Sequence, residues 1–486
     1  MNISIIGSGF SSLSAACYLA KYGYEVSVYE KNESIGGRAR QLTKEGFTFD
    51  MGPTFYWMPD IFDTFFKDFN KKTSDFYELK RLDPAYWVYF GINDFIEIGG
   101  NLESIYNAFD KEVPGSSKIL KSFISEAESN YNIAIKDLVY KMYGQSPLEL
   151  VSPSTIKKLN YFLTDIKQLV RKRFNNQKLI QILEFPVLFL GAKPSDTPAF
   201  YNFMNYADFG LGTWHPIGGM FSVVKAMEQL AKSLGVKIHT SSNVSEIKVK
   251  NNLTEGLVVN GNFIHSDLIL SGADYAHTET LIENKYRMYS EKYWNSKKFA
   301  PSALLFYLGF NKKIENVVHH TLFFDVNFDA HAFSIYDKPS WPDEPLFYAS
   351  FPSKTESRFA PEGCENAIIL IPLAPGIDDT PEIRARYLEI ILNRIESLTG
   401  QTIKENVIFK ETYCINDFIE DYNSFKGNAY GLANTLLQTA FLRPKLRSSK
   451  LKNLYFTGQL TVPGPGVPPS LISGKLAAEL IIKNNN

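Results

Sequence analysis

The residues with the most definite chemistry stand near the start of the chain. Gly7-Ser8-Gly9-Phe10-Ser11-Ser12 follows the apolar run Ile3 to Ile6 and has the spacing G-x-G-x-x-S. In a strand–turn–helix unit, the first glycine permits a tight turn and the second lets the backbone approach a pyrophosphate. The free N–H groups at the start of the following helix attract that anion. Taken alone, the pattern also fits an ordinary tight turn.

An acidic residue lies at the expected distance from these glycines. Glu30 ends a second apolar run, Val26 to Tyr29, and Lys31 follows it. A carboxylate about 20 residues after the glycine turn accepts a hydrogen bond from a ribose hydroxyl. The alternative is a solvated strand end. The glycines and Glu30 together predict a βαβ unit that binds a dinucleotide.

Two further glycine-rich segments have spacings that suit a flat, anionic cofactor. Gly36-Gly37-Arg38 precedes Gly52-Pro53-Thr54, and Gly458-Gln459 precedes Pro463 to Pro468. An arginine fork can donate two hydrogen bonds to a diphosphate. The C-terminal segment has the order strand, glycine-rich loop and helix start, and such a backbone can approach a flat ring closely. Its alternative is a proline-rich turn before a surface helix.

The N-terminal residues resemble a known superfamily. Their pattern is similar to the one shared by amine oxidases, protoporphyrinogen oxidases and phytoene desaturases. The resemblance implies that the chain binds FAD and that the Gly-Gly-Arg turn lies against the FAD diphosphate. It assigns these residues to the cofactor: Gly7, Gly9, Phe10, Ser11, Ser12, Glu30, Lys31, Gly36, Gly37, Arg38, Gly52, Pro53 and Thr54.

The C-terminal loop resembles the signature G-x-x-T-x-P-G-x-G-V-P of bacterial phytoene desaturases. The matching residues are Gly458, Thr461, Pro463, Gly464, Gly466, Val467 and Pro468. In the family this loop contacts the flavin, which implies cofactor roles for Gly458, Gln459, Gly466, Val467 and Pro468. Leu460, Val462 and Pro469 depart from the family, where a small residue, a histidine and a glycine are common. The absence of that histidine argues against a required proton carrier at position 462.

Two residues of the middle segment are also site candidates by resemblance. His215 lies in Thr213–Met220, which is similar to the family segment beside the isoalloxazine ring, so His215 is the one candidate catalytic residue. Its alternative is a loop histidine before a proline. Val244 is the first residue of an expected strand, at a position where backbone groups of the superfamily bind the adenine. The alternative is an ordinary buried valine without a role in cofactor binding.

The elements that must position these residues follow from the apolar pattern. Leu13, Ala16, Leu19 and Ala20 form one stripe of a helix that Gly23 ends. Residues 61–206 are expected to be mainly helical, and short strands are expected at 236–239, 244–249, 257–259, 268–270, 303–310, 346–351 and 367–371. Helices are expected at 221–234 and 381–398, with a short amphipathic helix at the C-terminal end.

These elements predict an α/β fold, and the resemblance implies a Rossmann-like FAD-binding domain of the glutathione reductase/amine oxidase type. That domain is assembled from discontinuous segments, and an α+β substrate domain with a mainly helical part is inserted between them. The expected FAD-binding domain comprises residues 1–60, 216–280 and 426–486. The expected substrate domain comprises residues 61–215, the mainly helical part, and 281–425.

Length and composition exclude several functional classes. The 486 residues exceed one hydrophobic core and correspond to roughly three domain-equivalents. With 51 basic and 52 acidic residues, no global charge attracts nucleic acid. Three separated cysteines without a CxxC pair predict neither disulfides nor a zinc site, and we expect no metal. The low number of cysteines and their wide separation favour the reducing cytoplasm as the location of the protein. Neither a signal peptide nor a membrane-spanning run is recognisable.

The resemblance implies a flavoprotein oxidoreductase of carotenoid biosynthesis. The expected reaction is FAD-dependent removal of a hydride and a proton from adjacent carbons of a long polyene. Phytoene or a hydroxylated carotenoid is the expected substrate, with 3,4-desaturation as one branch, and oxygen or a quinone reoxidises the flavin. The alternatives are a carotene isomerase that uses reduced FAD, an FAD amine oxidase, and a flavin-free module that binds prenylated proteins.

A stretch in the helical part bears on membrane contact. Apolar residues from Ile156 to Phe174 recur at helical spacing among lysines and arginines, such as Lys157, Lys158 and Arg171. A basic amphipathic helix of this kind can lie in a membrane interface. Its alternative is a helix packed on the core with a solvated face. Mainly because of the apolar substrate class, we expect a cytoplasmic protein that is peripherally associated with the inner membrane.

Overall fold

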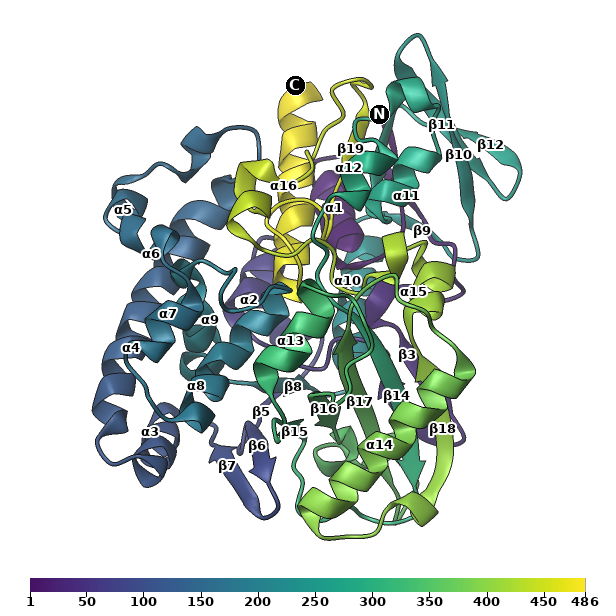
Figure 1. The fold of residues 1–486 in the computed structure, drawn as a ribbon. Coiled ribbons are helices and arrows are strands. Elements are labelled where there is room, and N and C mark those ends of the chain that lie inside the picture. Colours follow the sequence, from purple (N-terminus) through teal and green to yellow (C-terminus); the bar gives the residue numbers. More distant parts are fainter. Residues whose placement is uncertain (486) are drawn as a thin grey trace.

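The computed structural model describes residues 1–485, except for the side chains of residues 189 and 190. A parallel five-stranded sheet with flanking helices forms one part of the molecule, and a larger, mostly antiparallel sheet and a group of helices form the rest (Figure 1). Both ends of the chain lie in the part with the parallel sheet (Figure 1).

The parallel sheet has the strand order β19-β13-β1-β2-β9. All four pairings in it are parallel. Helix α1 packs against α10 on one side and against α16 on the other. The bounds are β1 Asn2–Ile6, α1 Phe10–Lys21, β2 Glu25–Tyr29, α10 Met220–Ser233, β9 Lys237–His239, β13 Leu268–Ser271, β19 Leu454–Phe456 and α16 Val467–Asn485. This arrangement confirms the predicted α/β class.

Smaller elements border this sheet. An antiparallel three-stranded sheet, β10-β11-β12, and the β3–β4 hairpin lie next to it in sequence. Their bounds and those of nearby helices are β3 Gln41–Lys44, β4 Phe47–Asp50, β10 Val244–Lys250, β11 Leu253–Val259, β12 Asn262–His265, α11 Tyr275–Thr280 and α12 Glu291–Asn295. The predicted domain boundaries stay a prediction.

The second large sheet has seven strands in the order β18-β14-β17-β16-β15-β6-β7. Strand β14 pairs with β17 and β18 and is buried along its whole length, so both faces of the sheet are covered at this strand. Helices α13, α14 and α15 follow strands of this sheet. The bounds are β6 Tyr86–Gly91, β7 Asp94–Ile98, β14 Ser302–Phe310, β15 His320–Phe323, α13 Phe328–Tyr336, β16 Phe347–Ser350, β17 Glu365–Leu373, α14 Pro381–Thr399, β18 Val407–Tyr413 and α15 Ile415–Tyr422.

The expectation that residues 61–206 are mainly helical was wrong for one stretch. Residues 79–98 contain three strands, and β6 and β7 join the seven-stranded sheet. The aromatic and β-branched residues of β6 favour a strand, and β6 pairs with β15, more than 200 residues later. The remaining strands of this region are β5 Leu79–Arg81 and β8 Trp214–Pro216, which pair with each other.

The expected continuous amphipathic helix was also wrong. The stretch is divided into three short helices, because Thr164 is extended and Asp165 caps a new helix by accepting a hydrogen bond from the Gln168 N–H at 2.7 Å. The helical part comprises α2 Pro59–Lys67, α3 Leu102–Glu112, α4 Ser116–Asn132, α5 Pro153–Ile156, α6 Leu159–Leu163, α7 Ile166–Arg171, α8 Gln177–Glu184 and α9 Phe203–Asn205.

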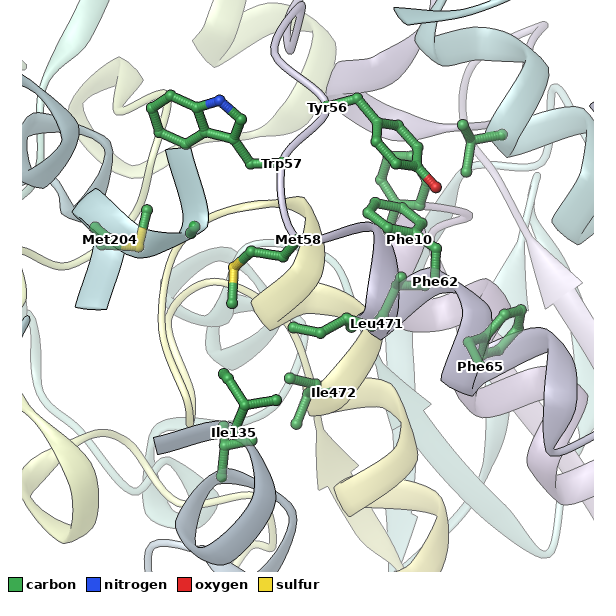
Figure 2. Close-up of a cluster of buried hydrophobic side chains, with 14 of the residues drawn as sticks. Phe10, Tyr56, Trp57, Met58, Phe62, Phe65, Ile135, Met204, Leu471 and Ile472 are labelled. Carbon is green, nitrogen blue, oxygen red and sulfur yellow. The ribbon is translucent and has the colours of Figure 1, made fainter. Parts of the chain in front are cut away.

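One hydrophobic core joins the parallel-sheet part to the helical part. Figure 2 shows Met58 together with Leu471 and Ile472 of α16 and with Ile135, which follows α4. All of these side chains are buried. Because the core is shared, the helical part is packed directly against the parallel-sheet part.

Candidate active site

A continuous cavity runs between the parallel-sheet part and the seven-stranded sheet. Glycine-rich turns line one end of it, and large apolar side chains line the other. We call the first set the cofactor cradle. Its members are Gly7, Gly9, Phe10, Ser11, Glu30, Lys31, Gly36, Gly37, Arg38, Gly52, Pro53, Thr54, Val244, Gly458, Gln459, Gly466, Val467 and Pro468.

The cavity thus brings together all predicted cofactor residues except Ser12. Ser12 is fully buried against Gly272, whose added β-carbon would lie 2.0 Å from the Ser12 Oγ. The small side chain at position 12 therefore allows close packing behind the turn, as a third glycine would. The cofactor roles of the lining residues stay predictions, because lining a cavity does not identify its occupant.

The first turn of the cradle leaves room for a ligand in front of helix α1. Gly9 precedes the helix, and a β-carbon added to it would meet no atom within 4 Å. Behind the turn, the buried Glu30 carboxylate accepts hydrogen bonds from Ser8 N–H at 2.9 Å, Ser8 O–H at 2.7 Å and Asn32 N–H at 3.0 Å. The carboxylate therefore fixes the turn while it also faces the cavity.

Arg38 is the cationic group of the cradle. Its Nη2 donates hydrogen bonds to Ser424 Oγ and to the Asn428 carbonyl, both at 3.1 Å, and its guanidinium carbon lies 4.9 Å from the centre of the Tyr422 ring. Its Nε is buried and has no hydrogen-bond partner among the described residues. Burial lowers the pKa of Arg38, and nearby Tyr422 and Asp274 oppose that effect. An anion such as a diphosphate would supply the missing partner.

Close backbone packing holds Arg38 in place. Gly36 has a φ of +102°, and an added β-carbon there would lie 2.9 Å from Val224. A β-carbon on Gly52 would lie 2.2 Å from the Arg38 carbonyl oxygen. These positions therefore require glycine, because a larger residue would force the turn away from helix α10 and from the Gly52-Pro53-Thr54 segment.

A buried arginine that the sequence analysis missed supports the C-terminal loop of the cradle. Arg443 is 1% exposed and donates hydrogen bonds to the carbonyls of Leu432 at 2.9 Å and Gln459 at 3.1 Å. Burial lowers the pKa of Arg443 to about 10. Nothing in the local sequence indicates this role, because the partners are backbone carbonyls separated from Arg443 by 11 and 16 residues.

Asp50 joins the cradle to helix α10. Its carboxylate accepts hydrogen bonds from the N–H groups of Met220 at 2.7 Å and Phe221 at 3.3 Å. Burial raises the pKa of Asp50 to about 6, although these two hydrogen bonds act in the opposite direction. Asp50 precedes the Gly52-Pro53-Thr54 segment of the sequence analysis and fixes the start of that segment to helix α10.

The second end of the cavity is lined by side chains from several distant segments. We call this set the apolar wall: Phe185, Met204, Ala303, Leu305, Leu322, Phe324, Phe328, Ile335, Leu346 and Phe347. Strand β14 shows how the sheet contributes, since Ala303 and Leu305 line the cavity while Leu304 and Phe306 face another core. The wall consists of aliphatic and aromatic side chains, which suit a hydrocarbon ligand.

A second buried carboxyl supports this wall. Asp208 accepts hydrogen bonds from Tyr86 O–H at 2.7 Å and Thr213 O–H at 3.2 Å, and Trp57, which lines the cavity, donates to Thr213 Oγ1 at 2.7 Å. Burial raises the pKa of Asp208 to about 7, and both hydrogen bonds partly offset that rise. The residue therefore titrates near neutral pH.

His215 lies behind the cavity wall instead of in the cavity. It is buried, and its Nε2 is 3.1 Å from Glu356 Oε2, which also accepts a hydrogen bond from Gly218 N–H at 2.8 Å. The His215 ring centre is 4.8 Å from that of His319. His215 is not among the residues that line the cavity. Its catalytic role stays a prediction that this position does not favour.

The comparisons with known proteins agree with a flavoprotein site. Residues 10–482 match the family model described as flavin containing amine oxidoreductase. A carotenoid 3,4-desaturase of Haloarcula japonica is 40% identical over 491 residues, which cover 99% of this chain and 98% of the relative. A 4,4'-diapophytoene desaturase of Staphylococcus haemolyticus is 30% identical, over 100% of this chain and 99% of the relative.

Solved structures share the fold at lower identity. An oxidoreductase from Methanosarcina mazei superposes with a TM-score of 0.66 at 17% identity, over 99% of this chain and 100% of that chain. Cyclohexylamine oxidase from Brevibacterium oxydans gives a TM-score of 0.63 at 13% identity, over 100% of this chain and 99% of that chain. At these identities the likeness concerns the fold alone.

Proposed function

The chain belongs to the family of flavin-containing amine oxidoreductases, and from this premise we propose that it is an FAD-dependent desaturase of a long carotenoid-type polyene. The whole-chain likeness to the carotenoid 3,4-desaturase carries the proposal. The cavity supports it, because the cofactor cradle opens directly onto a wall of aromatic and aliphatic side chains.

The chain's own groups fit FAD. The unpartnered Arg38 Nε, the open space in front of Gly9 and the first turn of helix α1 together suit a diphosphate. Glu30, Lys31 and Val244 line the cavity where the adenosine is expected. Bound FAD supplies an acceptor for a hydride taken from an allylic carbon.

The protein orients the substrate and keeps water away from it. The apolar wall excludes water and aligns an extended chain along the cavity. Charge that develops at an allylic carbon is delocalised over the polyene, so a strong base is not required for the loss of the neighbouring proton. Nearby His331 is unsuited to receive that proton, because its Nδ1 accepts from Leu346 N–H at 2.9 Å and its Nε2 pairs with the Pro372 carbonyl at 2.8 Å.

Pigment analysis tests the proposal. The chain is expressed in cells that accumulate phytoene, and hydroxylated carotenoids are supplied in parallel. We expect new chromophores at longer wavelength, and the precursor that disappears identifies the branch. A yellow, flavin-bearing protein that leaves every polyene unchanged would contradict the proposal. Geometric isomers without net oxidation would identify an isomerase, and turnover of amines alone would identify an amine oxidase.

The flavin needs an acceptor for its electrons, and we propose oxygen or a membrane quinone. Stopped-flow reoxidation of the reduced protein, with oxygen or with a soluble quinone under argon, separates the two. Reoxidation by neither acceptor within the turnover time would contradict both.

We also propose that the protein rests on the cytoplasmic face of the inner membrane. Among residues 1–485, no helix is long and apolar enough to cross a bilayer. An exposed apolar patch supports peripheral contact: Leu148 is 75% exposed, Leu163 is 76% exposed and Leu437 is 76% exposed. The patch is formed by 147–163 and 436–442, and the turns at Pro147–Leu150 and Ala440–Leu442 pack together and so join the two segments. α5 and α6 lie at the periphery (Figure 1).

The charge around the patch suits an anionic bilayer. Lys157 is exposed, and Lys158 is half-buried with its Nζ 5.1 Å from the centre of the Tyr161 ring. Leucines next to lysines insert into the acyl boundary while the cations stay at the headgroups. The interfacial element is therefore a set of short turns and helices, in place of the single helix expected from the sequence.

Co-flotation with vesicles that contain phosphatidylglycerol tests this patch. Replacing Leu148, Leu163 and Leu437 together by serine should reduce the vesicle-bound fraction about tenfold or more, since three partly inserted leucines are lost. The control replaces Ile92, 65% exposed, and Phe263, 55% exposed, which lie elsewhere, by serine. Equal flotation of both variants and the unchanged protein would contradict the assignment of the patch.

A further inference from the structure

A tyrosine and a histidine form a hydrogen-bonded pair where the cofactor cradle meets the apolar wall. Tyr348 lines the cavity from strand β16, and its hydroxyl is 2.8 Å from Oγ1 of Thr54, a member of the cradle. Its cross-strand neighbour on β15, Leu322, belongs to the apolar wall. The same hydroxyl is 2.6 Å from Nδ1 of His320, the first residue of β15. The pair therefore lies at the boundary between the two ends of the cavity.

The imidazole of His320 is enclosed and held in one orientation. His320 is fully buried, and its ring stacks on that of Phe55 with the ring centres 4.0 Å apart and the planes at 12°. The stack and the contact with Tyr348 together direct Nδ1 toward the cavity. The other ring nitrogen, Nε2, is buried and has no hydrogen-bond partner among residues 1–485. A buried polar atom left unpaired costs about 1–3 kcal/mol, which a purely structural histidine would not require.

On the basis of the proposed function, we propose that Tyr348 receives the proton that the polyene loses and that His320 acts through Tyr348 as its positioning residue. The second C–H bond breaks, its electron pair forms the new C=C bond, and its proton moves to the Tyr348 oxygen. The hydroxyl proton of Tyr348 moves in the same step to His320 Nδ1. The first C–H bond supplies the hydride, which carries two electrons to bound FAD. The resulting imidazolium then releases one proton to water.

The polyene needs such an acceptor because the wall keeps water out of the cavity. A tyrosine hydroxyl alone is a very weak base. It accepts a proton far more readily when it passes its own proton to an imidazole at hydrogen-bond distance, since no charge then accumulates on its oxygen. This pair is a weak acceptor overall, which is sufficient for a proton next to a delocalised allylic charge.

The protonation states of both residues before the reaction suit the transfer. Burial, reinforced by His215, lowers the pKa of His320 well below its ordinary value. Burial raises the pKa of Tyr348. Both side chains are consequently neutral at physiological pH, and one nitrogen of the His320 ring offers a lone pair. In the proposed state Nδ1 carries that lone pair and accepts from the Tyr348 hydroxyl.

Anaerobic reduction of the flavin in a single turnover tests the pair. The oxidised, FAD-loaded protein is mixed with vesicles that contain phytoene or the hydroxylated carotenoid consumed in the pigment analysis. The loss of flavin absorbance gives a limiting rate and a half-saturating polyene concentration. We expect Tyr348→Phe and His320→Gln each to lower the limiting rate about 100-fold at a similar half-saturating concentration. The double variant should be no slower than the slower single variant, because the two residues act as one unit.

Two further readings separate proton transfer from a structural role. After equilibration in D₂O, the unchanged protein should reduce its flavin more slowly than in H₂O, because the Tyr348 proton exchanges with solvent. Tyr348→Phe should show no such difference. In ¹⁵N spectra of histidine-labelled protein, the signal that His320→Gln removes should belong to a neutral ring protonated at Nε2. A ring protonated at Nδ1 would contradict the proposed direction of transfer.

His319→Gln is the matched control. His319 is also buried, and its ring centre is 4.4 Å from that of His320. Its Nδ1, however, is 2.6 Å from Oγ1 of Thr355 and not from a cavity tyrosine. The replacement should lower the thermal midpoint, since Thr355 loses a partner, but leave the limiting rate and the solvent isotope effect unchanged.

The outcomes separate the pair from the proposed function. If a polyene reduces the flavin equally fast in the unchanged protein and in Tyr348→Phe, the proposed function stands and the pair is overturned. An equal rate loss in Tyr348→Phe and His319→Gln, or an isotope effect that survives in Tyr348→Phe, would also overturn the pair. If neither polyene reduces the flavin of the unchanged protein, the proposed function fails and the pair fails with it.

Discussion

The cofactor cradle and the apolar wall face each other across one cavity but are built in different ways. The cradle consists largely of backbone turns, in which glycines permit close approaches such as that of Gly52 to the Arg38 carbonyl. The wall consists of side chains contributed by strands and helices from residue 185 to residue 347. Turn geometry restricts residue type at each position, whereas many apolar side chains can fill a wall.

This difference teaches where function is fixed and where it can change. A turn that binds a diphosphate tolerates few substitutions, so cofactor binding restricts the residue type at each position of the cradle. The side chains of the apolar wall can be replaced one at a time. We therefore expect the wall to determine the chain length and the end group of the substrate. Variants on each side should therefore fail in different ways.

Arg38→Leu should have the largest effect and should act on the cradle alone. It removes the cation whose buried Nε lacks a partner, and two charge-assisted hydrogen bonds to a diphosphate are worth about 3–5 kcal/mol. We expect FAD affinity to fall about 100-fold or more, measured by flavin fluorescence on dilution. Arg40→Leu is the control, because Arg40 does not itself line the cavity and already pairs with Asp421 and Tyr422. Equal flavin loss in both variants would contradict the distinction.

Asp50→Asn and Asp208→Asn compare one buried carboxyl from each side. Their raised pKa values, about 6 and about 7, mean that the folded state binds more protons than the unfolded state above about pH 4. The free energy of unfolding should therefore fall as the pH rises from 4 to 7, by about 2 kcal/mol or more for each group. Each asparagine variant should lack that decrease in urea titrations across this range.

Asp50→Asn and Asp208→Asn should differ in how FAD retention depends on pH. Asp50 accepts hydrogen bonds from the start of helix α10 beside the cradle, whereas Asp208 supports Trp57 through Thr213. Only Asp50→Asn should alter the pH dependence of FAD retention between pH 5 and pH 7, a window around its raised pKa of about 6. An identical pH profile for the two variants would show that the sides are not independent.

Ala303→Leu should act on the wall and spare the cradle. The added carbons project into the cavity from β14, so we expect polyene turnover to fall about tenfold while FAD content is unchanged. Leu304→Ala, one residue along the strand and facing the other core, should instead lower stability by about 2–5 kcal/mol. Unaltered turnover in Ala303→Leu would exclude β14 from the substrate wall.

His215→Gln should have the smallest effect on catalysis. His215 lies outside the cavity lining and bonds Glu356, so its replacement should cost about 1 kcal/mol of stability and leave turnover within about twofold. Steady-state pigment formation and the thermal midpoint provide the two readings. A loss of turnover at unchanged stability would restore His215 as a catalytic residue.

The cradle could largely be predicted from the sequence because its signals are local. A glycine at a tight turn, an acid after the second strand and an arginine after two glycines each indicate geometry within a few residues. Ser12 shows the limit of such reasoning. Its position in the motif was correct, but its side chain packs on Gly272 and does not line the cavity.

The wall could not be predicted because its contacts are distant in sequence. Strand β6 has a strand-like composition, but its partner β15 follows more than 200 residues later, and the surrounding helices masked it. The same holds for Arg443, whose partners are distant backbone carbonyls. Whether a buried polar group is satisfied depends on the three-dimensional neighbours, and no local pattern records it.

The order in which the parallel sheet is assembled has a consequence for biosynthesis. Strand β1 and helix α1 are made first, but β13 pairs with β19, and α16 packs on α1, only after nearly the whole chain has been synthesised. A nascent chain on the ribosome thus lacks the C-terminal loop and holds only part of the cradle. The protein consequently completes its synthesis before it can close the cradle.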